Sequence, residues 1–480
     1  MRNYSTIIYA IIIFLLPSSN IVTADEATSP NLGDPYSDIL PLNQEYIIGF
    51  SAYRTLQKYN LIINDPLVTS YIGYLGNLLS RNTLDSRRSY TFFITKTRSV
   101  NAFAIPGGFI GINTGLMNLT SNEAQLAGVL AHEIGHIKLR HTAEMIANAP
   151  TNSIAMWIGL MAGLLSGNAD AGIVALKAGL GISTQQNINL IRSNEVESDE
   201  FGIDLLRKSR FDIMEMAKFF SKMSEASGGI SQEMEYFSTH PMYENRISLI
   251  KSKSINQENS IISTTEDYYY VKNIVEVASI KDVDYAISSI ENDKPYGSHK
   301  KALLYMKKSE YKKAKALIIP LYKKYPNNIY FVTLYSRILN YEKNFEKSID
   351  VLTNLKNNYP TNNVISFKLA ETFIENQINL DYAEKLLKSI ESEQRLNPNY
   401  LRLMSKLYVY KNNIYNSKLY LSEFHLMVDN LDLAVQVIDD GLNSYKLSSR
   451  QILALKEKKR QIICTYQRPL EPIFGEKTCN

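Results

Sequence analysis

Cysteine is nearly absent from this chain of 480 residues, which contains only Cys464 and Cys479, both in its C-terminal tail. In an oxidising compartment the two thiols can close a loop of about 15 residues, which stabilises a fold by ~3 kcal/mol if the loop is unstrained. In the cytosol, two free thiols are the better interpretation. The sequence alone leaves both interpretations open.

A large excess of charge is also missing. The formal net charge is +4, with 45% hydrophobic and 21% charged residues. This composition is that of a folded protein, and so small a charge on so long a chain gives no argument for nucleic acid, which we therefore do not expect as a partner. A single core seldom grows past ~250 to 300 residues, so the length predicts at least two domains.

The N-terminus lacks the ~20 apolar residues that a helix needs to span a bilayer. Arg2 precedes an apolar run over residues 7–16, which is followed by Pro17 and by small residues at 22–24. This pattern predicts an export signal over residues 1–24 that is cleaved after Ala24, with an uncleaved anchor as the alternative. No cysteine follows the cleavage site, so a lipid anchor is not indicated.

A second apolar segment, 154–182, is divided by a polar stretch at 166–170, and each half is again too short to span a bilayer. It is either a helical hairpin or an exposed apolar lip around Trp157 that contacts a membrane surface or an unfolded client. Periodicity does not decide between them, and insertion of the segment would instead indicate a membrane-anchored protein.

Histidine is scarce as well, and four of the six histidines fall between residues 132 and 240. His132 and His136 lie one turn apart on a predicted helix, so both imidazoles can bind one cation while Glu133 reaches the same cleft. Zinc takes such neutral imidazoles with a third protein ligand and keeps one position for water. The pattern indicates a zinc hydrolase, with one Zn²⁺ per chain and Glu133 as the base.

Two carboxylates further along the chain complete this prediction. Glu195 and Asp199 are one helical turn apart, which suits one carboxylate on the metal and another behind it that holds a ligand histidine. An acidic solvated face is the alternative, but the turns at 201–206 are largely apolar and favour a packed helix. We assign Glu197 to the surface, and His141, five residues after His136, falls outside the metal shell.

Thr239-His240-Pro241 and Arg246 follow this second helix. His240 can occupy the open position of zinc and keep the enzyme latent until substrate displaces it. Alternatively, His240 and Arg246 stabilise the oxyanion that develops at the scissile carbonyl. A plain turn histidine is the third possibility.

A β-hairpin is expected just before the metal helix. Residues 90–94 and 100–105 have strand character, and the second strand enters a Pro-Gly-Gly turn at 106–108 and returns over 109–113. An exposed strand edge there can bind an extended peptide through main-chain hydrogen bonds. The expected helices span 43–58, 66–79, 120–148 and 186–207. A capping box from Thr120 to Glu123 begins the third of them.

These motifs resemble those of the gluzincin peptidases related to the CAAX prenyl protease and the mitochondrial overlapping-activity peptidase. The resemblance covers nearly the whole mature chain. It is closest to those members of the family that also carry tetratricopeptide repeats. The motifs that carry it are Asn101 to Gly108, His132-Glu133-Ile134-Gly135-His136, Glu195 to Asp199 and Thr239-His240-Pro241.

The resemblance implies a role for each residue of these motifs. His132, His136 and Glu195 bind zinc, Glu133 is the base and Asp199 stands behind a ligand. It further implies a location in the periplasm. The partners it implies are unfolded or misassembled outer-membrane proteins and the machinery that inserts β-barrel proteins into the outer membrane.

The second half of the chain is repetitive. Small residues recur at 314, 348, 383 and 417, in steps of 34, 35 and 34, and a Tyr-Pro pair at 325 recurs at 359. This period is that of tetratricopeptide repeats, whose stacked helix pairs form a curved surface that binds peptides or partner proteins. The third and fourth copies depart from the pattern, because Pro398 comes late and the fourth copy lacks its proline.

The predicted fold class is α+β and mostly helical, a zincin-like domain with a small sheet followed by a helical repeat solenoid. The expected domains are a signal peptide at 1–24, a peptidase domain at 25–250, a linker at 251–281, repeats at 282–462 and a tail at 463–480.

The predicted function is that of an exported zinc metalloendopeptidase in protein quality control, which cleaves stalled outer-membrane β-barrel proteins and assists their assembly. The alternative is a chaperone or scaffold that binds clients through its repeats with little proteolysis.

Overall fold

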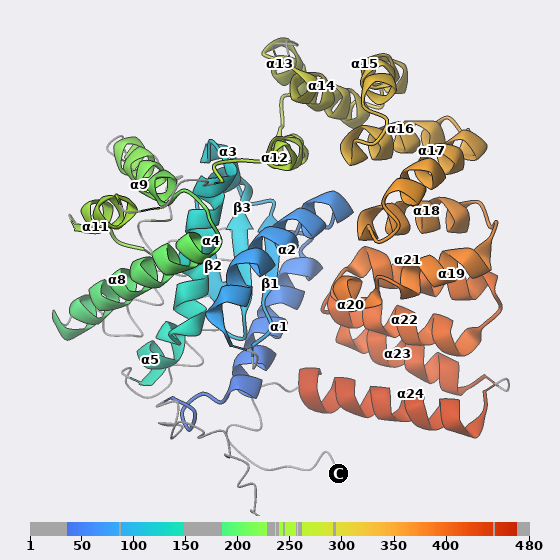
Figure 1. The fold of residues 1–480 in the computed structure, drawn as a ribbon. Helices are drawn as coiled ribbons and strands as arrows, with labels where there is room; N and C mark the ends of the chain where they lie inside the picture. Colours follow the sequence, from blue (N-terminus) through green and yellow to red (C-terminus); the bar gives the residue numbers. More distant parts are fainter. Residues whose placement is uncertain are drawn as a thin grey trace, which may run out of the picture.

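The computed structural model describes residues 36–467 apart from 86–87, 148–184, 228–235, 237–239, 243–244, 256, 258–261, 291–293 and 445–446 (Figure 1). The predicted signal at 1–24 and the apolar segment 154–182 therefore lie outside the described residues. Among the residues that are described, none of the helices combines the length and the apolarity that a bilayer crossing requires.

The sheet has the strand order β1-β3-β2 and consists of β1 (Thr91–Thr95), β2 (Ala102–Ile105) and β3 (Phe109–Asn113). Strand β1 runs parallel to β3, whereas β2 pairs with it antiparallel. The predicted hairpin is thus confirmed, and its turn requires glycine because Gly107 and Gly108 have φ angles of 80° and 89°. Strand β2 lies at an edge of the sheet.

Helices α1 (Leu42–Lys58) and α2 (Pro66–Ser80) cover the sheet on the side of β1. Helix α2 begins as predicted, because the Asp65 carboxylate accepts a hydrogen bond from the Leu67 amide and Pro66 takes the first helical position. The Tyr53 ring of α1 meets the Phe93 ring of β1 edge-on at a centroid distance of 5.2 Å. These helices pack against the sheet, and the sheet in turn contacts the metal helix.

The metal helix differs from its prediction at both ends. Helix α4 (Glu123–Lys138) begins one residue after Asn122, whose side chain accepts from the Gln125 amide. The predicted Thr120 cap is wrong, because the Thr120 hydroxyl donates to the Met117 carbonyl. The chain then bends at Arg140, which has a φ of 61°, and continues as a separate short helix, α5 (His141–Ala147).

The second metal helix, α8 (Gln185–Lys208), crosses α4 at very close range. A Cβ atom at Gly135 would lie 3.0 Å from the Ser198 Cα, and one at Gly202 would lie 3.1 Å from the His132 nitrogen. The two backbones approach this closely because both positions lack a side chain. Helix α9 (Ile213–Ser227) packs on another face of α4 and against α11 (Asn245–Ser254).

The predicted linker at 251–281 is shorter in the structure. Helix α12 (Glu266–Ser279) occupies its second half and buries Tyr268, Val271 and Val275. It packs against α2, against α3 (Thr114–Leu119) and against the first repeat helices. This helix joins the peptidase domain to the repeat region.

The C-terminal half is a curved stack of paired helices, drawn from yellow to red in Figure 1. The small residues Ala314, Ser348, Ala383 and Ser417 are all buried, which confirms the positions predicted for helix contacts. The stack lies against α1 and α2, where Arg54 pairs with Asp429 at 3.2 Å. Its helices are α13 (Val283–Ser288), α14 (Pro295–Lys307), α15 (Tyr311–Lys324), α16 (Ile329–Tyr341), α17 (Phe345–Asn358), α18 (Asn363–Glu375), α19 (Leu380–Lys388), α20 (Glu391–Gln394), α21 (Pro398–Tyr410), α22 (Ile414–Met427), α23 (Leu431–Leu442) and α24 (Ser449–Gln461).

We predict that Gly135→Ala lowers the free energy of unfolding by ~1 to 3 kcal/mol, because the added methyl group forces α4 and α8 apart. Gly73→Ala is the matched control, since a Cβ at this helical glycine meets nothing within 4 Å. The control should be neutral or stabilising by up to ~1 kcal/mol. Urea unfolding of the full chain measures both, and equal stabilities of the two variants would contradict the close-packing argument.

Candidate metal centre

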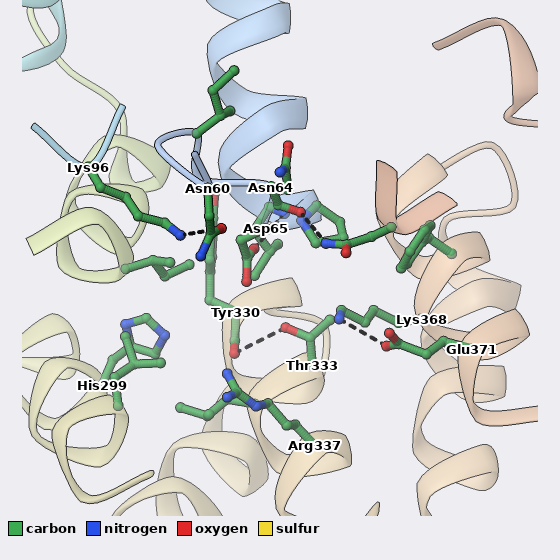
Figure 2. A pocket seen from close by; sticks show the side chains of 18 residues that line it. Asn60, Asn64, Asp65, Lys96, His299, Tyr330, Thr333, Arg337, Lys368 and Glu371 are labelled. Atoms are coloured by element: carbon green, nitrogen blue, oxygen red, sulfur yellow. Dashed lines mark hydrogen bonds and ion pairs between the residues drawn. The ribbon is translucent and has the colours of Figure 1, made fainter. Parts of the chain in front are cut away.

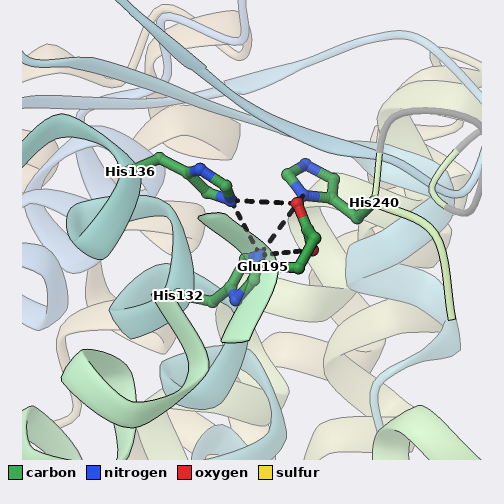
Figure 3. Close-up of side chains that lie close together, drawn as sticks. All are labelled: His132, His136, Glu195 and His240. Atoms are coloured by element: carbon green, nitrogen blue, oxygen red, sulfur yellow. Dashed lines mark hydrogen bonds and ion pairs between the residues drawn. The ribbon is translucent and has the colours of Figure 1, made fainter. Parts of the chain in front are cut away.

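Four side chains converge at the crossing of α4 and α8 (Figure 3). His132 and His136 come from α4, Glu195 from α8, and His240 from the segment before α11. One ligand atom from each lies within 4.8 Å of every other. The cluster brings together the residues that the sequence analysis singled out as ligands.

The donor atoms fit a tetrahedral zinc ion. The Nε2 atoms of His132 and His136 are 3.0 Å apart, and each lies 3.4 Å from an oxygen of Glu195. Ligands at ~2.1 Å from a tetrahedral zinc ion are about 3.4 Å from each other. These three side chains therefore have the chemistry and the spacing of a zinc site with one position left over.

His240 lies against the other three residues of the cluster. Its Nδ1 atom is 3.2 Å from the His132 Nε2 and 3.1 Å from Glu195 Oε1. The ring stacks on Tyr236 at a centroid distance of 4.7 Å and an angle of 27°. The Tyr236 amide donates to the Val100 carbonyl, just ahead of strand β2.

Two buried groups stand behind the cluster. The Asp199 carboxylate lies 2.9 Å from the His132 Nδ1, so it can hold the proton of that ring while Nε2 faces the metal site. The Arg246 guanidinium reaches Asp199 Oδ2 at 2.6 Å and Glu195 Oε2 at 2.8 Å. Arg246 is only 1% exposed and contacts both carboxylates, a geometry that suits positioning of these two groups.

Burial and neighbouring charge shift the pKa values in opposite directions across the cluster. Burial lowers the pKa of His136 to about 3. Burial also acts to lower the pKa of His132, but hydrogen bonds with Asp199 and Glu195 outweigh it and raise the pKa to about 9. Burial opposes ionisation of Glu195, but the neighbouring histidines, His240 foremost, hold its pKa well below the usual range.

Glu133 differs from the other acids of the cluster in its lack of a hydrogen-bond partner among the described residues. It is fully buried, and neither carboxylate oxygen accepts a hydrogen bond from the described residues. The His240 Nε2 lies 3.4 Å from Glu133 Oε1. Burial raises its pKa, as expected for a carboxylate that exchanges a proton.

His141 is a neighbour of the site whose contact the sequence analysis missed. It lies outside the group of four donor residues, but its Nδ1 is 2.9 Å from the Nδ1 of His136. The prediction of one continuous helix to residue 148 placed His141 on another face, and the bend at Arg140 turns it back. Glu197 is half exposed, in keeping with its assignment to the surface.

Comparison with known proteins gives a consistent result. A model of peptidase family M48 matches residues 76–254. The beta-barrel assembly-enhancing protease of Escherichia coli K12 is 27% identical over 442 residues, which cover 89% of this chain and 90% of that protein. A Vibrio cholerae relative that provisionally carries the same name is 32% identical over 324 residues, or 65% of this chain and 67% of the relative.

More distant likenesses are partial. The mitochondrial metalloendopeptidase OMA1 of Saccharomyces cerevisiae is 31% identical over 183 residues, which cover 36% of this chain and 50% of that protein. Among solved structures, a human IFIT1 dimer aligns with a TM-score of 0.28 and 10% identity over 74% of this chain and 96% of its own chain. The latter similarity is too weak to carry an argument.

We predict that Arg246→Ala lowers the free energy of unfolding of the metal-free protein by ~3 to 5 kcal/mol, because it leaves two buried carboxylates without their cation. Lys208→Ala is the control, since it breaks an exposed pair with Asp204 on the same α8 helix. That variant should change stability by less than ~0.5 kcal/mol. Denaturant melts with chelator present test this, and a loss below 1 kcal/mol for Arg246→Ala, about the value of an exposed pair, would argue against the bridging role.

Proposed function

Since the chain belongs to peptidase family M48 and is a metallopeptidase, we propose that it is a zinc endopeptidase whose single Zn²⁺ is held by His132, His136 and Glu195. The observation that carries this proposal is the close approach of the His132 and His136 Nε2 atoms to each other and to the Glu195 carboxylate, with the Glu133 carboxylate, which accepts no hydrogen bond from the described residues, on the same helix as the histidines. Bound zinc supplies a Lewis acid for the scissile carbonyl and lowers the pKa of a bound water to ~7.

The residues of the chain supply proton transfer and positioning. Glu133 accepts the proton of the attacking water and returns it to the leaving amine. Asp199 fixes the tautomer of His132, and Arg246 holds Asp199 and Glu195 in place. We propose that the edge of β2 pairs with the substrate backbone, so that cleavage depends little on substrate side chains.

We further propose that His240 keeps the enzyme latent. Its Nδ1 faces the other donor atoms from the fourth side, where an attacking water would otherwise be placed. Substrate entry then requires His240 to leave. The chain contact between Tyr236 and Val100 supports this, because it holds the same segment next to the proposed substrate edge.

The proposed setting is the periplasm, where the enzyme removes misfolded or stalled outer-membrane β-barrel proteins and assists their assembly with the insertion machinery. The names of the E. coli and V. cholerae relatives support this assignment. Cys464 is disulfide-bonded, and the sequence holds one other cysteine, Cys479. A disulfide favours an oxidising compartment such as the periplasm.

A second candidate function, client binding by the tetratricopeptide-type repeats, is favoured by a cavity of about 390 Å³ between the repeats and the peptidase domain (Figure 2). The loop from Asn60 to Leu67 and Lys96 form one wall, and α14, α16, α18 and α21 form the others. A second cavity of about 500 Å³ shares Arg337 and Lys368 with it and continues along α16 and α18.

Three basic and two acidic side chains line this cavity, and the small excess of positive charge favours a polypeptide with exposed carboxylates. Lys368 is paired with Glu371 at 3.0 Å, whereas Arg337 has no carboxylate partner in the described part of the chain. Lys96 is half buried and contacts only the amide oxygen of Asn60, at 2.8 Å, among the described groups. An extended client chain can pair its acidic groups with Arg337 and Lys96 and its backbone with the neighbouring amides.

Glu133→Gln should lower hydrolysis of an unfolded model substrate by at least ~10²-fold while about one zinc per chain remains bound, because only the base is removed. His240→Ala should raise turnover above wild type if His240 blocks the site. Glu200→Gln, on the exposed face of α8, is the control and should match wild type. Zinc content and turnover measured together decide this, since unimpaired hydrolysis by folded, zinc-loaded Glu133→Gln would refute the proposed base.

Client binding is tested in the Glu133→Gln background, where the client stays intact. Arg337→Glu should weaken binding of a denatured β-barrel protein about tenfold through like-charge repulsion. Lys347→Glu, on the outer helix α17 and half exposed, is the matched control and should bind as the parent does. Fluorescence anisotropy gives both affinities, and equal weakening by the two substitutions would place client binding elsewhere.

A further inference from the structure

His141 lies against the back of a proposed metal ligand. Its Nδ1 is 2.9 Å from the Nδ1 of His136, and the two ring centroids are 5.0 Å apart. His136 presents its other nitrogen, Nε2, to the metal site, 3.0 Å from the Nε2 of His132. His141 is therefore related to His136 as Asp199 is related to His132.

The bend between α4 and α5 creates this contact. Arg140 takes the left-handed conformation, with a φ of 61°, so α5 leaves the direction of α4 and turns His141 toward His136. The Arg140 guanidinium is buried and pairs with Glu45 of α1 at 2.9 Å. It also donates to the Leu40 carbonyl. An ion pair with another helix thus holds the bend that places His141.

Hydrogen-bond chemistry assigns the protons of this pair. A ring that offers Nε2 to a metal carries its proton on Nδ1, so His136 donates and the Nδ1 of His141 must accept. His141 then carries its own proton on Nε2, which faces the Glu197 carboxylate at 3.7 Å. The Ser198 hydroxyl also lies 3.2 Å from this Nδ1, so it shares the single lone pair of that nitrogen with the His136 donor.

We propose that His141 is a positioning residue for His136: it accepts the Nδ1 proton of that ligand and so fixes the ring and tautomer that bind zinc, with Glu197 orienting His141 in turn. The inference rests on the proposed metal centre. With this contact, each proposed ligand histidine has its own buried hydrogen-bond partner at Nδ1, Asp199 for His132 and His141 for His136.

The test measures Zn²⁺ affinity by competition with a chromophoric chelator, in full-length Glu133→Gln protein so that no turnover intervenes. His141→Leu removes the acceptor and should weaken binding ~10- to 100-fold. His141→Asn should restore affinity to within about threefold of the parent, because its Oδ1 stands where Nδ1 of His141 stands and accepts the same proton. The visible spectrum of the Co²⁺ form should change in the Leu variant and remain parental in the Asn variant.

Glu197→Ala serves as a second variant that leaves the core untouched, since the Glu197 side chain is 53% exposed. It should weaken Zn²⁺ binding a few-fold, whereas Glu200→Ala, one residue past Asp199 and exposed, should not. Parental affinity in both His141→Leu and Glu197→Ala would overturn the proposal, as would an equal loss in the Leu and Asn variants, which indicates packing alone. A parental protein that binds no Zn²⁺ would instead refute the proposed metal centre.

Discussion

The close approach of α4 and α8 is the constraint on which the rest of the structure depends. Gly135 and Gly202 let the two backbones meet where a side chain would not fit, with hypothetical Cβ contacts of 3.0 and 3.1 Å. The imidazoles of one helix then face the carboxylates of the other across a distance that a single cation can bridge. The sheet, α2 and α9 surround this crossing and bury it.

Burial at the crossing makes its charges interdependent. Glu195 and Asp199 are almost completely buried; burial opposes their ionisation, but the neighbouring histidines hold the pKa of Glu195 low, and Arg246 and His132 hold the pKa of Asp199 low. Removal of one partner leaves a buried charge unpaired in a medium that solvates it poorly. The charged groups of the cluster therefore stabilise one another, and loss of any one of them destabilises the others. Glu133 lies beside this network, with its Oε1 3.4 Å from the His240 Nε2, and neither of its carboxylate oxygens accepts a hydrogen bond from the described residues.

The repeat region, like the metal site, is held in place by a contact between segments that lie far apart in the sequence. It rests on the outer surface of α1 and α2, where the buried Arg54 pairs with Asp429, and it leaves a polar cavity beside the loop that leads into α2. Because α2 also packs on β1 and α4, the client surface and the metal site share one structural support. The peptidase domain and the surface that we propose for client binding thereby share one core.

The sequence by itself determined the features that follow from local periodicity: the pitch of His132 and His136, the turn between Glu195 and Asp199, the Pro-Gly-Gly hairpin and the repeat period. It did not determine the start of α4, because Thr120 and Asn122 are both good caps and only the surrounding packing selects Asn122. It also missed the contact of His141, because the bend at Arg140 is held by Glu45, 95 residues away in the sequence. Spacing along one helix is a local property, whereas the direction of Arg246 and the neighbour of His136 depend on which distant segments meet, and only the tertiary structure decides that.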